Sequence, residues 1–203
     1  MLHHEGLVGR TDHKTELVRN VYDITKRYLE LAKGTDVIDT LPDIKIYYIY
    51  TKFFIEDKTT EERKNDIEEM KQCRPLETNR IYYVIFLMEM LMTINDETGV
   101  VSLLENYKEK GIDKENKCFC WLFLSFRFGK AEYAKNGFEI LVNNNISIPN
   151  IHSTLYINAV MTFSQDLSTF LEKLEFEDTS VQEVYQATYD YYVKQKCVQK
   201  HIE

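Results

Sequence analysis

The hydrophobic pattern of the chain centres on one stretch, IYYVIFLMEMLMTI at residues 81–94, in which Glu89 is the only charged residue. A helix that is apolar around its whole circumference has to be covered on every side. The stretch is shorter than the roughly 20 residues that a membrane-spanning helix needs. It therefore predicts a central helix packed between other helices. A second apolar stretch, CFCWLFLSFRF at residues 118–128, predicts another such helix.

The N-terminal part of the chain predicts a tail followed by an amphipathic helix. Residues 1–13 are polar, and we expect a flexible tail there. From Thr15 the spacing is helical, and Gly34 is a suitable residue to end the helix. Five apolar residues follow the 4-3-4-3 spacing of one helix face: Leu17, Val21, Ile24, Tyr28 and Leu31.

The stretch IKIYYIYTKFF at residues 44–54 is compatible with two kinds of element. Its β-branched and aromatic residues suit a strand. The preceding residues include Pro42, which is typical of the first turn of a helix. Length and context favour a buried helix, and a strand remains the alternative.

Local sequence also predicts where several helices begin. Thr59 and Glu62 have the spacing of a capping box, in which each side chain bonds to the backbone N–H of the other residue. Ser180 and Glu183 have the same spacing and predict the start of the last helix. Asp113 is placed to cap the helix that contains residues 118–128.

A very apolar helix, an amphipathic helix and a short loop recur along the chain. A recurring helix pair with a period of about 35 residues indicates a solenoid. We therefore expect residues 14–203 to form a single all-α domain, an α-solenoid of about five antiparallel helix pairs, with an irregular helical bundle as the alternative. The predicted pairs span residues 42–78, 79–113, 114–149 and 150–178, followed by a C-terminal helix at 180–199.

Two segments resemble known helical-hairpin repeats. The sequence SLLENYKEKGIDKE at residues 102–115 resembles the end of a pentatricopeptide unit. The spacing of Trp121, Leu124, Ser125 and Phe128 is similar to the large-large-small-large positions in the first helix of a tetratricopeptide unit. The resemblance implies a right-handed superhelix whose surface binds other molecules.

Composition and charge narrow the compartment and the partners. With 44% hydrophobic and 29% charged residues the chain is an ordinary globular protein, and 7 Gly and 3 Pro are too few for a many-stranded β-sandwich. Four cysteines form no paired framework, which favours a reducing, cytoplasmic location. No segment predicts a signal peptide or a membrane span. A net charge of −8 argues against a DNA-coating protein and favours basic protein partners.

The sequence contains no catalytic motif. It lacks a glycine-rich phosphate loop, a GxSxG elbow and a metal-ligand spacing, so we expect no enzyme activity, no cofactor and no metal. One helix carries several carboxylates that could in principle act in acid–base chemistry, but we expect them to form a solvated face. These residues are Glu61, Glu62, Asp66, Glu68 and Glu69.

Two groups of residues are candidates for contact with a partner. The first is the basic stretch, which could meet RNA phosphate or an acidic protein loop: Lys108, Lys110, Lys114, Lys117, Arg127, Lys130 and Lys135. The second is on the last helix, where Tyr189 and Tyr192 could bury their rings against another molecule.

A helical-repeat array without catalytic groups is usually a binding surface. We expect a regulatory factor, monomeric when free, that docks on a large assembly, most naturally the ribosome with its basic proteins and RNA. The Lys-, Ile-, Asn-, Tyr- and Phe-rich style resembles proteins of reduced, microsporidian-type eukaryotes, and this implies a dormancy factor that inhibits translation by occlusion. The alternatives are a pentatricopeptide-like protein that binds single-stranded RNA, and a tetratricopeptide-like adaptor that binds peptides in trafficking, chaperone or degradation machinery.

Overall fold

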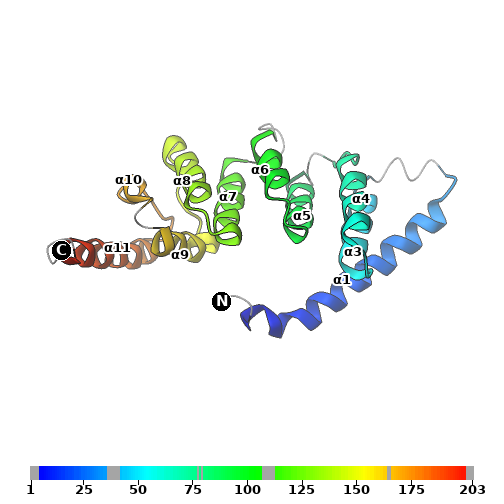
Figure 1. The fold of residues 1–203 in the computed structure, drawn as a ribbon, viewed down its shortest axis with the longest axis horizontal. Coiled ribbons are helices and arrows are strands. Elements are labelled where there is room, and N and C mark those ends of the chain that lie inside the picture. Colours follow the sequence, from blue (N-terminus) through cyan, green and yellow to red (C-terminus); the bar gives the residue numbers. More distant parts are fainter. Residues whose placement is uncertain are drawn as a thin grey trace. The chain divides into compact units, whose positions relative to one another are not determined.

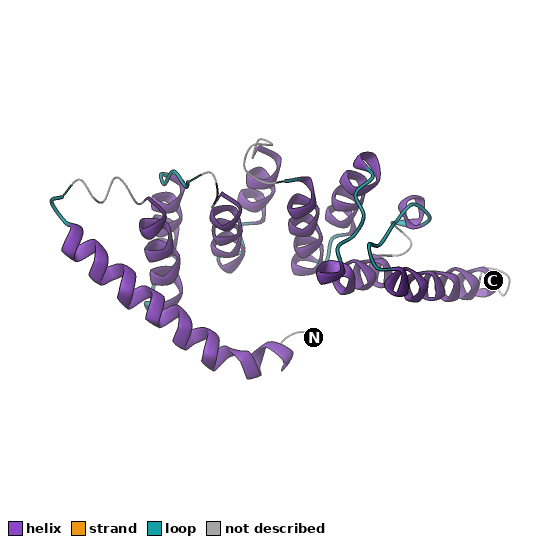
Figure 2. Ribbon diagram, turned by 180° about the vertical axis from the view of Figure 1, so that it is seen from behind, coloured by secondary structure: helices purple, strands orange, loops and turns teal. Residues whose placement is uncertain are grey.

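The computed structural model describes residues 5–35, 42–76, 78, 80–106, 113–163 and 166–199. All the regular secondary structure in this part of the chain is helical apart from one isolated β-bridge, as Figures 1 and 2 show. The chain divides into a first unit, Met1–Tyr107, and a second unit, Lys108–Glu203. The sequence predicts one domain over residues 14–203, whereas the described helices gather into these two units.

The first unit consists of helices packed against their neighbours in the chain. Helix α1 packs on α3, α4 also packs on α3, α5 contacts both α3 and α4, and α6 packs on α5. The bounds are α1 (Glu5–Ala32), α3 (Pro42–Ile55), α4 (Thr60–Lys71), α5 (Arg80–Thr93) and α6 (Glu97–Asn106).

Helix α5 is the central helix that the sequence predicts. Leu87, Met88 and Leu91 are almost completely buried, and Glu89 is half-buried. Tyr82 is 51% exposed, so one side of the helix is less covered than expected. The ambiguous stretch at residues 44–54 is also helical, because it forms most of α3.

The predicted capping box at the start of α4 is confirmed. The Thr59 hydroxyl accepts from the backbone N–H of Glu62 at 3.3 Å, and the backbone N–H of Thr59 donates to the Glu62 carboxylate at 2.8 Å. Helix α6 begins with a similar cap, since Asp96 Oδ1 accepts from the backbone N–H of Gly99 at 2.9 Å. A Cβ atom at Gly99 would collide with the Asp96 carboxyl group, which explains the glycine.

Helix α1 differs from its prediction in two respects. It begins at Glu5, within the segment expected to be a tail and well before Thr15. It also buries a different face from the expected one. Tyr22, Thr25 and Ala32 are buried, whereas the three leucine and isoleucine side chains of the expected face are 64% to 75% exposed. The reason is the contact of Tyr22 with α3, described below.

The second unit is built around a helical hairpin. Gly129 adopts a left-handed conformation (φ 66°) that ends α7, and α8 starts two residues later. Helix α9 packs on both, α10 packs on α8, and α11 packs on α9. The bounds are α7 (Lys114–Phe128), α8 (Ala131–Asn144), the 3-10 helix η2 (Asn150–His152), α9 (Ser153–Phe163), α10 (Ser168–Leu171) and α11 (Thr179–Gln199).

Helices α7 and α8 lie close together at Gly137. A Cβ atom at this position would lie 3.1 Å from the carbonyl oxygen of Cys118 and 3.4 Å from Cβ of Trp121. The core around them includes Leu122, Phe138 and residues of α9 and α11. A larger residue at this position would therefore require the two helices to shift apart.

The start of α11 corrects one prediction. The cap is Asp178 rather than Ser180, because Asp178 Oδ1 accepts from the backbone N–H of Ser180 at 2.8 Å and from its hydroxyl at 2.6 Å. These bonds hold the pKa of Asp178 below its usual range. Nearby, Ile148 forms an isolated β-bridge with Phe176, which ties the end of the α8 loop to the segment before α11.

Candidate functional site

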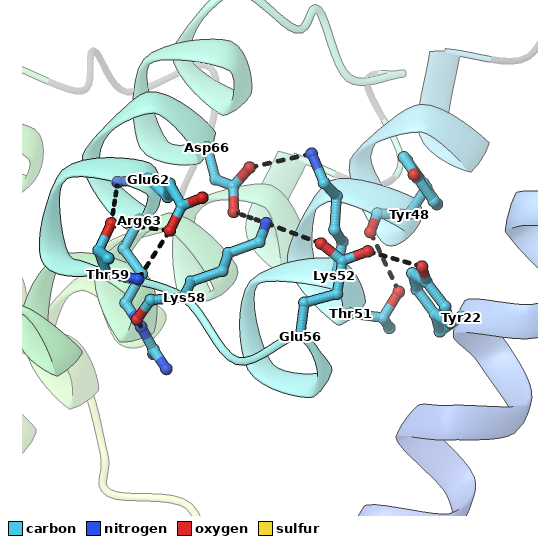
Figure 3. A network of polar contacts seen from close by, with 10 residues as sticks. All are labelled: Tyr22, Tyr48, Thr51, Lys52, Glu56, Lys58, Thr59, Glu62, Arg63 and Asp66. Atoms are coloured by element: carbon cyan, nitrogen blue, oxygen red, sulfur yellow. Dashed lines mark hydrogen bonds and ion pairs between the residues drawn. The ribbon is translucent and has the colours of Figure 1, made fainter.

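A network of buried and half-buried charges lies between α3 and α4 (Figure 3). Asp66 on α4 is 4% exposed and pairs with two lysines, Lys52 on α3 at 3.2 Å and Lys58 in the α3–α4 loop. The prediction that the carboxylates of this helix lie in open water is therefore wrong for Asp66. Glu61, Glu62 and Glu68 are exposed, and Glu69 is half-buried.

The buried lysine Lys58 holds two carboxylates at once. Its side chain is buried, and its Nζ lies 3.3 Å from Glu56 Oε2 as well as against Asp66. A buried charge is tolerated only when a partner compensates the loss of water. Two lysines and two carboxylates meet here, so the charges of the network balance.

Tyr22 joins α1 to this network. Its hydroxyl donates to Glu56 Oε1 at 2.7 Å, and its ring stacks on Tyr48 of α3 with centroids 5.8 Å apart. The bond to the carboxylate, together with burial, raises the pKa of Tyr22 to about 12. Burial opposes ionisation of Glu56, but the hydrogen bonds from Tyr22 and Lys58 outweigh it, and the pKa of Glu56 lies below its usual range.

The network is suited to structural rather than catalytic work. Burial acts to lower the pKa of Lys52, but the bond to Asp66 and its charge outweigh this and raise it. The amine therefore stays protonated at neutral pH and offers no nucleophilic lone pair. The network fixes α1, α3 and α4 relative to one another.

A second cluster forms an aromatic surface on α3 and α5. We define the aromatic surface as Tyr47, Tyr50 and Phe54 of α3 with Tyr82 and Phe86 of α5. Tyr50 stacks on Phe86 with ring centroids 4.0 Å apart, Tyr47 meets the same ring edge-on at 5.4 Å, and Phe54 meets Tyr50 at 5.0 Å. Phe54 and Tyr82 are exposed, so part of the surface faces water.

Acidic groups border the aromatic surface. The Tyr50 hydroxyl donates to Glu89, and both burial and this bond raise the pKa of Tyr50. Burial and the nearby charge of Asp43 raise the pKa of Tyr47. The phenols are thus neutral at physiological pH, and aromatic faces beside carboxylates attract cations.

The aromatic residues of α3 and α5 were not predicted from the sequence to form a surface. Tyr48 turns towards α1, whereas Tyr47 and Tyr50 turn towards α5. The sequence signal for this surface is the helical spacing of Tyr47, Tyr50 and Phe54. Nothing in that spacing identifies α5 as the opposing helix.

The structure does not gather the described members of the basic stretch into one patch. Lys114 and Lys117 lie in the first turn of α7, where Lys114 Nζ donates to Asn144 Oδ1 at 2.5 Å. Arg127 lies in the last turn, about 20 Å along the helix at 1.5 Å per residue. Lys108 and Lys110 lie outside the described residues.

The other basic candidates lie near the α7–α8 turn and on α8. Arg127 packs over the Phe128 ring at 6.0 Å, and Lys130 over the Tyr133 ring at 5.7 Å. Lys135 forms an ion pair with Asp166 at 3.7 Å. Each of these three side chains therefore has a contact within the second unit.

The two tyrosines predicted on the last helix are only partly described. Tyr189 is half-buried, its hydroxyl donates to Glu172 Oε1 at 3.3 Å, and its ring lies 6.4 Å from that of buried Tyr185. The side chain of Tyr192 lies outside the described residues. A docking role for both residues stays a prediction.

The described part of the chain contains neither a cysteine with a lowered pKa nor a metal-binding group. Burial raises the pKa of Cys118 and of Cys120 to about 12, so neither is a reactive thiolate at neutral pH. Among the described residues, no group of three or more His, Cys, Asp or Glu side chains could hold a metal ion. None of the described helices has the length and apolar character needed to cross a membrane.

No family model, no curated protein and no solved structure matches the chain. The fold therefore defines the class: over the described residues, an all-α protein in which helices close in sequence pack on one another within each unit. The first unit adds to this fold a buried ion network and a partly exposed aromatic surface.

Proposed function

We propose that the chain is an α-solenoid of helical hairpins and acts as a non-enzymatic binding factor on a large assembly. A packing pattern that recurs in both units supports this. Helix α3 contacts α4 and α5, and α4 contacts α5; in the same way α7 contacts α8 and α9, and α8 contacts α9. Stacking of each hairpin on the first helix of the next is the packing typical of tetratricopeptide-like repeats.

The aromatic surface is the observation that carries the binding role. It lies on α3 and α5, the first helices of two consecutive hairpins, and Glu89 and Asp43 border it. Exposed rings beside carboxylates suit lysine- or arginine-rich protein segments. The net charge of −8 favours the same partners.

Ribosomal proteins are an abundant source of such basic segments, so we propose the ribosome as the assembly and occlusion of a functional site as the mode of translation inhibition. A peptide-binding adaptor is the second candidate, because the aromatic surface would serve an isolated basic peptide equally well. The separated lysines and arginines of the second unit give less support to an RNA-binding role.

Sedimentation through a sucrose gradient tests this function. The purified full chain, mixed with ribosomes at low salt, should move with the ribosomal fractions and should reduce translation in a cell-free system. Tyr82→Ser should weaken the association about tenfold or more, because exposed aromatic residues commonly dominate binding surfaces. Phe123→Ser, which removes an exposed ring from α7, is the matched control and should have little effect.

Two results would count against the ribosome. The chain could remain in the light fractions while it binds a lysine-rich peptide, and this would leave the adaptor function. The chain could instead shift a labelled single-stranded RNA at low salt with the same affinity after Tyr82→Ser, and this would move the function to RNA.

A further inference from the structure

Helix α1 carries a row of apolar side chains that the first unit leaves uncovered. We define the α1 stripe as Leu17, Val21, Ile24, Tyr28 and Leu31. Leu17 is 64% exposed, Ile24 is 69% exposed and Leu31 is 75% exposed, whereas Val21 and Tyr28 are half-buried. An exposed, contiguous apolar row of this kind marks an interaction surface.

The spacing of the stripe indicates that its occupant is a helix. The most exposed residues recur every seven positions, and the other two fall between them at the a and d positions of a heptad. A heptad row is complementary to the same row on another helix, because each side chain enters a hole between four side chains of the partner. The neighbouring face of α1, with Tyr22 and Thr25, is already covered.

The charges of α1 indicate that this helix belongs to a second copy. Two chains of net charge −8 repel each other over most of their surfaces. Residues 16–33, however, hold four basic and three acidic side chains, so α1 is close to neutral and adds little to this repulsion. The acidic row at Glu16, Asp23 and Glu30 and the basic row at positions 19, 26 and 33 lie on the side of the helix opposite to its apolar faces.

An antiparallel pair of α1 helices matches four of the five stripe residues with one another, and Leu31 then lies level with position 14 of the other copy. Leu17 of one copy then lies level with Tyr28 of the other, and Val21 lies level with Ile24. At the open edge of the stripe, Arg27 meets Asn20 of the second copy rather than a like charge. A surface that matches itself under a two-fold rotation gives a closed dimer.

We infer that two copies of this chain associate through the α1 stripe as an antiparallel helix pair. This departs from the expectation that the free protein is a monomer. It is independent of the aromatic surface and of any partner assembly.

Sedimentation equilibrium of the full chain tests the inference. The chain alone should show a concentration-dependent mass that approaches twice its 24.1 kDa. Ile24→Glu should raise the dissociation constant about 100-fold or more, because it places an unpaired carboxylate in both halves of the interface. The helix content by circular dichroism should not change, because Ile24 lies on the surface of the single chain.

Two further variants separate the stripe from general surface effects. Val184→Glu changes a comparably exposed aliphatic residue, 59% exposed on α11, and should leave the dimer intact. Arg27→Glu places a carboxylate beside the neutral Asn20 at the edge of the interface, and it should weaken the dimer much less than Ile24→Glu. A dimer weakened equally by Val184→Glu and Ile24→Glu would overturn the assignment to α1.

Cross-linking tests the orientation. Leu17→Cys combined with Tyr28→Cys should give disulfide-linked dimers under oxidation, and Leu17→Cys alone should give few. Efficient cross-linking by Leu17→Cys alone would overturn the antiparallel arrangement.

Three results would overturn the dimer itself. The first is a monomer at every concentration. The second is a dimer unaffected by Ile24→Glu. The third is a monomer that binds ribosomes and loses this binding on Ile24→Glu, which would assign the stripe to the partner assembly and leave the ribosomal function standing.

Discussion

In the first unit a buried carboxylate pairs with two lysines, whereas the core cluster of the second unit consists of aliphatic, aromatic and small side chains. Asp66 sits between Lys52 and Lys58, and each of these residues comes from a different segment of the first unit. Leu122 and Phe138 in the second unit meet only by close packing around Gly137. Both kinds of contact hold helices together. The ion pairs need oppositely charged residues from different segments, whereas the apolar core needs close packing.

Buried ion pairs and apolar packing differ in what they contribute. Removing ions from water is costly, so the pairs of the first unit add little net stability and mainly determine which segments can meet. Apolar packing contributes stability roughly in proportion to the area buried. We therefore expect the two units to respond differently to the same kinds of substitution.

The largest effect is expected from a charge placed in the second unit. Leu122→Asp introduces a carboxylate into a core cluster whose described members carry no charge. It should cost on the order of 5 kcal/mol or more and unfold this unit, since the whole stability of a domain is of that size. Thermal unfolding by circular dichroism measures this, and Phe123→Asp at the partly exposed neighbouring position should have a clearly smaller effect. A cooperative, native-like melt of Leu122→Asp would contradict the apolar character of this core.

A smaller but substantial loss is expected when the existing buried carboxylate is removed. Asp66→Ala leaves Lys58 buried with only Glu56 as partner and should destabilise the first unit by about 3 to 5 kcal/mol. Urea denaturation measures the difference. Glu68→Ala, which removes an exposed ion pair with Lys71 from the same helix, should cost less than about 1 kcal/mol. Equal effects of the two substitutions would mean that Asp66 is not the centre of the network.

Tyr22→Phe tests the link from α1 to the network. It removes one hydroxyl that donates to Glu56 and should destabilise the first unit by about 1 kcal/mol. Amide hydrogen exchange should become faster in α1 before it becomes faster in α5. Unchanged exchange in α1 would indicate that ring stacking on Tyr48, and not the hydrogen bond, holds this helix.

The same chemical change in the second unit should have the opposite sign. The hydroxyl of Tyr156 is fully buried and has no hydrogen-bond partner among the described residues, while its ring meets Phe138 edge-on at 5.8 Å. Tyr156→Phe should therefore be neutral or stabilising by up to about 1 kcal/mol, because it removes an unsatisfied polar group. Urea denaturation measures this, and a clear destabilisation would contradict the assignment.

Elements set by local sequence were predictable. The apolar runs at residues 44–54 and 81–94 are helical, and the capping box of Thr59 and Glu62 forms as its spacing indicates. At the last helix two capping residues compete within three positions. Spacing alone does not decide between Asp178 and Ser180, and the observed cap is Asp178.

Features that depend on distant segments were not predictable in this way. Helix α1 has two apolar rows offset by one residue, one starting at Leu17 and the other at Val18. Either row could face the protein, and contacts of Tyr22 with Tyr48 and Glu56 select the second. The residues around Asp66 in the sequence are typical of an exposed helix face. Its burial depends on the ion pairs with Lys52 and Lys58, which the local sequence does not show.

The bond between Tyr22 and Glu56 spans 34 residues, and this separation has a consequence during synthesis. A ribosome that adds 5–20 residues per second needs roughly 2 to 7 seconds to make the intervening chain. Throughout that interval α1 has both apolar rows without a partner from its own unit. We therefore expect a nascent chain of this protein to expose apolar segments of the kind that chaperones bind, and we expect α1 to be accessible to neighbouring nascent chains on one messenger RNA before either has folded.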